Sequence, residues 1–113
     1  MQIDIWLDDE RDPTDEFIQR EFGANGNELW LKTTKECAEL IRQGNVRSIS
    51  FDNDLGYNQT EGRKLARWIE SQAHDNKIKP IAWRVHTQNT IAYVEICKAM
   101  QNADKYWKEH NAL

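Results

Sequence analysis

The chain has 113 residues, which is the length of one typical domain, and 15 basic against 19 acidic side chains give it a net charge of −4. This acidic balance argues against a dedicated nucleic-acid binder, which usually carries an excess of basic residues. Hydrophobic residues make up 39% and charged residues 30%, which excludes a disordered tail, and no apolar run approaches the roughly 18 residues of a membrane span. The first ten residues lack the pattern of a signal peptide, and two cysteines are too few for a disulfide scaffold. We therefore expect a small cytoplasmic protein that forms a single domain over residues 1–113.

Predicted strands and helices alternate along the chain. Short apolar runs predict strands at residues 3–7, 28–32, 46–51 and 81–85. Apolar side chains at helical spacing predict a short helix opened by residues 12–14, and longer helices at residues 33–44, 62–72 and 89–101. Thr33 and Glu36 fit the capping box that begins the second of these helices, and Gly44 provides its stop.

Strict alternation of strands and helices is typical of an α/β fold with a parallel sheet and helices on both faces. Right-handed crossovers leave few topologies, and the simplest at this length is the flavodoxin-like strand order 2-1-3-4. Residues 104–113 contain Tyr106 and Trp107. We expect this segment to be either a further helical turn or an interface element that binds a second copy or another protein.

Polar and charged residues follow three of the predicted strands. Asp8 and Asp9 follow the first strand, Asp52 follows the third, and His86 and Thr87 follow the fourth. In an open parallel sheet, ligands bind beyond the carboxyl ends of the strands, at the point where the strand order reverses. In the order 2-1-3-4 this point lies between the first and third strands. We therefore expect the three carboxylates to point into one crevice, with His86 and Thr87 beside it.

Three carboxylates brought together repel one another unless their pKa values rise or a cation lies among them. Mg²⁺ prefers hard oxygen ligands and keeps room for water and phosphate, so Asp8, Asp9 and Asp52 predict a Mg²⁺ or Mn²⁺ site. Each residue also has a simpler interpretation when it is taken alone. The acidic run after the first strand suits a solvated loop, and Asp52 or Asp54 suits a turn or cap. Their joint placement at one edge of the sheet favours a functional site.

Three further side chains complete the predicted chemistry. Arg11 presents a fork of donors matched to phosphate, and Thr87 offers a hydroxyl for a phosphoryl oxygen. His86 is a candidate general acid or base, a role that imidazole side chains commonly fill. Its simpler interpretation is a hydrogen-bonded structural histidine, because the backbone readily satisfies a neutral imidazole.

This pattern resembles a receiver domain of the response-regulator type over residues 1–101. The resemblance rests on Asp8, Asp9, Asp52 and Thr87. In receivers the acids bind Mg²⁺, the aspartate after the third strand accepts a phosphoryl group, and the threonine senses it. The chain departs from receivers because no fifth strand ending in Lys-Pro follows Thr87, and the usual proline after the phosphoacceptor is missing.

A closer resemblance is to the compact family of cyclic-phosphate-processing receiver domains. The family pattern Trp-Leu-Asp-Asp-x-Arg matches residues 6–11, Asp-x-Asp-Leu-Gly matches residues 52–56, and a histidine followed by a small hydroxyl residue matches residues 86–87. This resemblance implies a receiver-like fold that processes cyclic phosphates. It also accounts for Arg11, Asp54, Gly56 and His86, which ordinary receivers do not need.

We therefore predict a small metal-dependent phosphoesterase that acts on a phosphate ester such as a cyclic nucleotide phosphate. The metal ligands would be the three carboxylates named above, Arg11 and Thr87 would bind the phosphate, and His86 or Asp54 would move the proton. A covalent phosphoryl group on Asp52 is an open alternative. The rival hypothesis is a non-catalytic module that binds a nucleotide, a metal or a protein partner. A stand-alone phospho-receiver is the third hypothesis.

Overall fold

Four parallel strands form the sheet of the computed structural model, which describes residues 2–111. The elements in chain order are β1 (Ile3–Leu7), α1 (Glu16–Phe22), β2 (Leu29–Leu31), α2 (Thr34–Gln43), β3 (Val46–Phe51), α3 (Gly62–His74), β4 (Ala82–Val85) and α4 (Thr90–Asn111). The strand order is β2-β1-β3-β4, and every neighbouring pair is parallel. The predicted α/β class and the flavodoxin-like order 2-1-3-4 are confirmed. Among residues 2–111 no fifth strand is present, so β4 is an edge strand.

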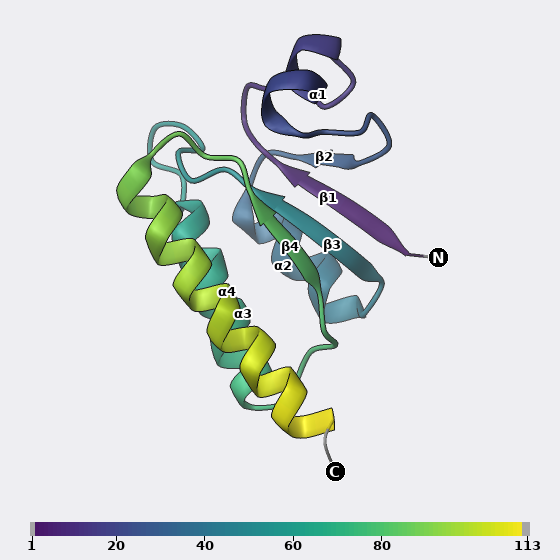
Figure 1. Cartoon of the computed structure of the whole chain (residues 1–113), viewed down its shortest axis with the longest axis vertical. Helices are drawn as coiled ribbons and strands as arrows, with labels where there is room; N and C mark the ends of the chain where they lie inside the picture. The colour runs from purple at the N-terminus through teal and green to yellow at the C-terminus, as the bar shows by residue number, and fades with distance from the viewer. Residues whose placement is uncertain (1, 112–113) are drawn as a thin grey trace.

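One face of the sheet forms the hydrophobic core. Side chains alternate between the two faces of a strand, so Ile5 and Leu7 of β1 share a face with Ile49 and Phe51 of β3. These four side chains are almost fully buried in one cluster with apolar residues of α2, α3 and α4. Figure 1 shows α3 and α4 running side by side along the sheet, which agrees with their close packing against each other. The three longer helices therefore fix the sheet from one side.

The other face of the sheet is covered near the carboxyl ends of the strands by the segment around α1. Arg84 of β4 donates a hydrogen bond of 2.7 Å from Nη2 to the carbonyl of Gly23, directly after α1. Trp6 of β1 is fully buried on this face, and its Nε1 donates to the carbonyl of Arg11 at 2.9 Å. The first contact holds the end of α1 and the second holds the β1–α1 loop over the end of the sheet.

The last helix is longer than the sequence pattern predicts. We expected it to end near residue 101, but α4 continues to Asn111. Ala99, Ala103 and Trp107 follow at intervals of four residues and are all buried, so the apolar stripe continues through the expected tail. The Nε1 of Trp107 donates to the carbonyl of Ile78 at 3.2 Å. Trp107 is therefore part of the core and not an exposed interface side chain. Of the two expected alternatives for residues 104–113, residues 104–111 form the further helical turns, and residues 112–113 lie outside the described residues.

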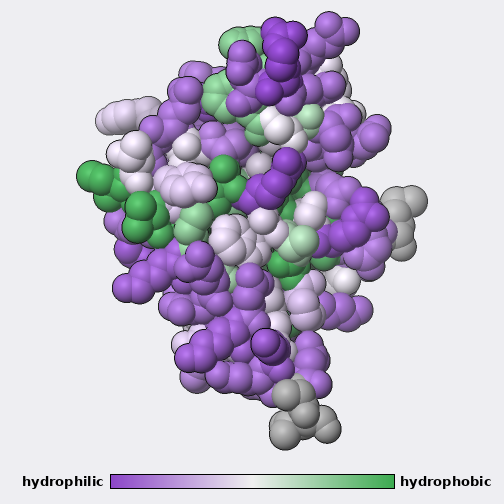
Figure 2. All heavy atoms as spheres, viewed as in Figure 1, coloured by the Kyte–Doolittle hydropathy of each residue, from purple (hydrophilic) through white to green (hydrophobic). Residues whose placement is uncertain are grey.

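The surface seen in Figure 2 is mainly hydrophilic. Hydrophobic side chains gather at its left, over the first turns of α4. This region contains the exposed Ile91 and Val94. None of the helices in residues 2–111 combines the length and the apolar character that a bilayer crossing requires.

Candidate functional site

A cavity of about 580 Å³ opens beyond the carboxyl ends of β1, β3 and β4. Its walls come from the loops that follow these strands. The lining residues are Asp9, Glu10, Arg11, Asp52, Asp54, Gly56, Thr87, Gln88 and Asn89. Most of the site residues predicted from the sequence therefore line one cavity at the point where the strand order reverses. Asp8 and His86 are buried directly behind this wall.

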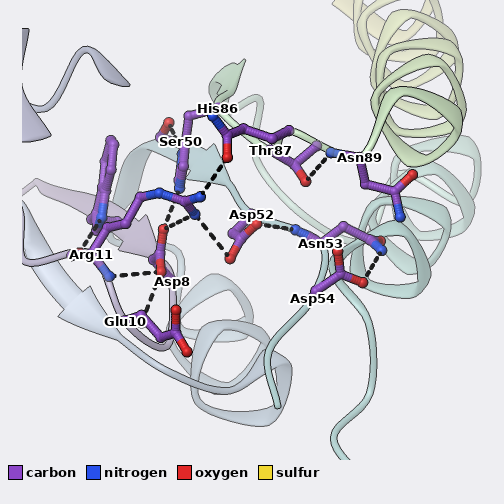
Figure 3. A network of polar contacts seen from close by, with 12 residues as sticks. Asp8, Glu10, Arg11, Ser50, Asp52, Asn53, Asp54, His86, Thr87 and Asn89 are labelled. Atoms are coloured by element: carbon purple, nitrogen blue, oxygen red, sulfur yellow. Dashed lines mark hydrogen bonds and ion pairs between the residues drawn. The ribbon is translucent and has the colours of Figure 1, made fainter. Parts of the chain in front are cut away.

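Three carboxylates converge at the cavity. Asp8, Asp9 and Asp52 each offer one carboxylate oxygen, and these oxygens all lie within 4.8 Å of one another. Figure 3 shows the Asp8 and Asp52 side chains approaching each other from β1 and β3. Asp9 lies close to Gly56, because a Cβ placed on that glycine would be 3.5 Å from Asp9 Oδ2. A set of hard oxygen donors beside an open cavity fits Mg²⁺ or Mn²⁺.

Asp8 is held by hydrogen bonds on both of its carboxylate oxygens. Oδ1 accepts the backbone N–H groups of Glu10 and Arg11, each at 2.9 Å. Oδ2 lies 2.9 Å from His86 Nε2 and 3.3 Å from Arg11 Nη1. Burial raises the pKa of Asp8, but the hydrogen bonds from His86 and from the two backbone N–H groups outweigh it, and the pKa lies below its usual value. Asp8 is therefore ionised at neutral pH.

Asp52 has the opposite electrostatic character. Burial, reinforced by the negative charge of Asp8, raises the pKa of Asp52 to about 6. The backbone N–H of Asn53, which donates to Oδ1 at 2.8 Å, and the charges of His86 and Arg11 offset only part of this effect. The fold therefore places an incompletely compensated carboxylate at the cavity wall, which is the environment that favours binding of a cation.

His86 lies behind Asp8 and does not line the cavity. Its Nδ1 is 2.8 Å from Ser50 Oγ, its Nε2 is 2.9 Å from Asp8 Oδ2, and only 3% of its side chain is exposed. Its ring stacks on Trp6, with centroids 3.9 Å apart and planes 4° apart. Both ring nitrogens therefore have protein partners, and His86 orients Asp8 instead of facing a substrate.

Replacement of His86 tests the buried hydrogen bonds that join it to Asp8 and Ser50. We expect His86→Ala to lower the free energy of unfolding by about 2–3 kcal/mol, since Asp8 Oδ2 and Ser50 Oγ both lose a buried partner. Urea denaturation measures this change. The control His74→Ala alters an exposed histidine and is expected to cost about 1 kcal/mol or less. Equal effects of the two variants would contradict the proposed support of Asp8.

The loop after β3 is fastened to the start of α3. Asn53 is fully buried, and its Oδ1 accepts the backbone N–H of Arg63 at 3.0 Å. Its Nδ2 donates to Asp54 Oδ1 at 3.2 Å and to Glu61 Oε2 at 3.1 Å. Asp54 thus lies at the cavity with an exposed side chain whose position is fixed from behind.

Thr87 presents its hydroxyl to the same cavity from the β4–α4 loop. Its Oγ1 accepts the backbone N–H of Asn89 at 3.2 Å, so the hydroxyl proton remains free to donate to an anion. Ser50 and Asn53 support the site from behind and were not predicted from the sequence. A signal for Ser50 existed, because Ser50 stands two residues before Asp52 and therefore lies on the same face of the strand as Asp52.

Comparison with known proteins agrees with this geometry. A family model described as "Cyclic-phosphate processing Receiver domain" matches residues 3–102. Searches of curated proteins and of solved structures gave no significant match. The family match spans all four strands, the three loops that line the cavity and most of α4. On that basis the chain belongs to the cyclic-phosphate processing receiver domains.

Proposed function

We propose that the protein is a small phosphoesterase that uses Mg²⁺ or Mn²⁺ and acts on a phosphate ester, with cyclic nucleotide phosphates as its substrates. The observation that carries this proposal is the convergence of three carboxylates, a guanidinium and a hydroxyl on one cavity. The carboxylates suit a divalent cation, and Arg11 and Thr87 suit the oxygens of a phosphate. Membership of a cyclic-phosphate processing family supports the substrate class.

In this mechanism Asp8, Asp9 and Asp52 would hold the metal ion, which when bound polarises a phosphoryl oxygen and neutralises developing charge. Arg11 and Thr87 orient the phosphate from two sides of the cavity. His86 is a positioning residue, because it lies behind the cavity wall and contacts the site through its hydrogen bond to Asp8.

Asp54 is the proton acceptor that the geometry favours, since its exposed carboxylate lines the cavity while His86 has no free nitrogen. It takes a proton from the water molecule that attacks the phosphorus atom. One P–O bond of the ring breaks, the departing oxygen is protonated from solvent, and a phosphate monoester is the product.

A second candidate function is a non-catalytic module that binds a nucleotide or a metal. It is favoured by the ion pairs within the site, because Arg11 already contacts both Asp8 and Asp52 and offsets part of their charge. A binding module needs no free general base. The burial of Trp107 removes one of the two aromatic residues that supported docking of a protein partner at residues 104–113.

Metal binding and turnover separate these functions. We expect Mg²⁺ or Mn²⁺ to raise the melting temperature, with a stabilisation of roughly 2–3 kcal/mol at a concentration of about 100 Kd. We also expect metal-dependent hydrolysis of 2′,3′-cyclic or 3′,5′-cyclic nucleotides. Asp54→Asn is expected to reduce this hydrolysis by about 10²–10⁴-fold while leaving the metal-induced stabilisation in place.

Three results would contradict these expectations, and each has a different meaning. Absence of any stabilisation by either metal would reject the metal site and with it the phosphoesterase. Metal-dependent binding of a cyclic nucleotide without turnover would identify the binding module. Hydrolysis that survives unchanged in Asp54→Asn would assign the proton transfer to another group.

A further inference from the structure

The guanidinium of Arg11 lies between two of the carboxylates that form the proposed metal site. Its Nη1 is 3.3 Å from Asp8 Oδ2 and 3.8 Å from Asp52 Oδ2. Figure 3 shows this side chain reaching from the β1–α1 loop toward both acids. The positive charge of Arg11 therefore already neutralises part of the negative charge that a divalent cation would bind.

The backbone and the side chain of Arg11 are held differently. The backbone is fixed, because its N–H donates to Asp8 Oδ1 and its carbonyl accepts Trp6 Nε1. The guanidinium is held less firmly on the solvent side. It lies 4.3 Å from the ring centroid of Phe22, and its Nη2 donates to the exposed Gln88 at 3.1 Å. A quarter of the Arg11 side chain is exposed. The guanidinium can therefore move within the cavity while its attachment point stays in place.

We propose that Arg11 is an exchangeable counter-ion, which a divalent cation displaces from Asp52 and which then binds the phosphate. This inference rests on the proposed metal site and adds the way in which that site is regulated. A metal ion and a guanidinium repel each other and compete for the same carboxylate oxygens, so both cannot neutralise Asp8 and Asp52 together. Gln88 also lines the cavity and accepts from Arg11 Nη2 at 3.1 Å, so this contact keeps the displaced guanidinium at the cavity.

This exchange couples the two ligands. Without metal, Arg11 Nη1 donates to Asp8 and lies at ion-pair distance from Asp52, and a phosphate also meets the negative charge of the three carboxylates. With metal bound, this charge is neutralised and the guanidinium is free to donate. Each ligand must therefore strengthen the binding of the other by the same factor, as linkage requires.

Calorimetric titration of the purified protein with Mn²⁺ and with inorganic phosphate tests the exchange. In the wild type, saturating Mn²⁺ is expected to tighten phosphate binding at least about fivefold, the lower end of usual coupling. We expect Arg11→Ala to bind Mn²⁺ about tenfold more tightly than the wild type, because a competing positive charge is gone. The same variant is expected to lose most of the gain in phosphate affinity that Mn²⁺ produces.

Arg47→Ala is the matched control. Arg47 forms an ion pair with Asp4 at the opposite end of β1, so the variant removes the same charge from an Asp–Arg pair outside the cavity. Its Mn²⁺ affinity and its phosphate coupling are expected to match those of the wild type.

Three outcomes would overturn the inference, and they differ in their meaning. Mn²⁺ affinity that is unchanged or weaker in Arg11→Ala, with Mn²⁺ binding intact in the wild type, rejects the exchange and leaves the metal site standing. Phosphate affinity that is independent of Mn²⁺ in the wild type rejects the coupling, even if Arg11→Ala fails to fold. Absence of Mn²⁺ binding in both proteins rejects the proposed metal site together with the exchange.

Discussion

Replacement of Asp52 by asparagine is expected to stabilise the metal-free protein at pH 7 and to abolish its stabilisation by Mg²⁺. Burial and the charge of Asp8 raise the pKa of Asp52 to about 6, so its ionised form is unfavourable in the folded state. The rise of the Asp52 pKa from 3.8 to about 6 corresponds to a free-energy cost of about 3 kcal/mol for the ionised form in the folded state. Asp52 lines an open cavity, where solvent weakens the effect of burial, so we expect Asp52→Asn to stabilise the metal-free protein by about 1–2 kcal/mol.

The pH dependence follows from the direction of this shift. The pKa of Asp52 is higher in the folded protein than the usual 3.8, so the folded state binds more protons between about pH 4 and pH 6. The contribution of Asp52 to stability therefore falls as the pH rises through this window and is constant above it. The wild type and Asp52→Asn are expected to have equal stability near pH 4 and to diverge by pH 7.

Melting temperatures recorded from pH 4 to pH 8, with and without Mg²⁺, check both parts of this prediction. Asp104→Asn makes the same chemical change at an exposed carboxylate that accepts a hydrogen bond from Trp83, and it should respond to Mg²⁺ as the wild type does. A variant at position 52 that is less stable than the wild type at pH 7 would show that Asp52 is structurally required. A retained Mg²⁺ response would show that Asp52 is not a ligand.

Replacement of Gly62 by alanine is expected to destabilise the protein by about 3 kcal/mol or more, which is the upper range for overpacking. Gly62 is the first residue of α3, and its N–H donates to the carbonyl of Asn53 at 2.9 Å. A Cβ at this position would lie 1.9 Å from the carbonyl oxygen of Asp52. That oxygen belongs to the backbone, so the helix and the end of β3 must move apart. The same displacement shifts Asp52 and is expected to weaken metal binding in any variant that folds.

Helix propensity alone predicts that Gly62→Ala stabilises the protein, so the sign of the stability change shows whether the clash is present. Alanine is about 1 kcal/mol more favourable than glycine within a helix, so a variant without a clash would be more stable than the wild type. Gly44→Ala is the control, because its φ of 82° disfavours alanine while the nearest contact of a Cβ would be an ordinary 3.6 Å. We expect it to cost about 1 kcal/mol. Urea denaturation of both variants gives the comparison, and stabilisation by Gly62→Ala would refute the close approach.

Much of the fold and the convergence of the site follow from the sequence alone. The alternation of apolar runs predicted the four strands and their order, because few topologies satisfy right-handed crossovers at this length. Asp8, Asp9 and Asp52 were expected together for the same reason, since the carboxyl ends of parallel strands lie along one edge of the sheet. Local chemistry also predicted the start of α2, where Thr33 Oγ1 accepts the N–H of Glu36 at 3.3 Å.

The tertiary structure decided the partners of each side chain and the extent of the last helix. His86 was expected at the cavity, but Ser50 and Asp8 occupy both of its nitrogens, and both partners are distant in sequence. Asp54 was expected either to face the site or to cap a loop, and its position depends on Asn53, which is held by α3. Trp107 is buried because Ile78 and the core reach it, although its polar neighbours suggest an exposed tail. Sequence periodicity indicates which face of an element is apolar. It does not indicate which distant donor, acceptor or apolar surface each side chain contacts, because these partners meet only when the chain packs.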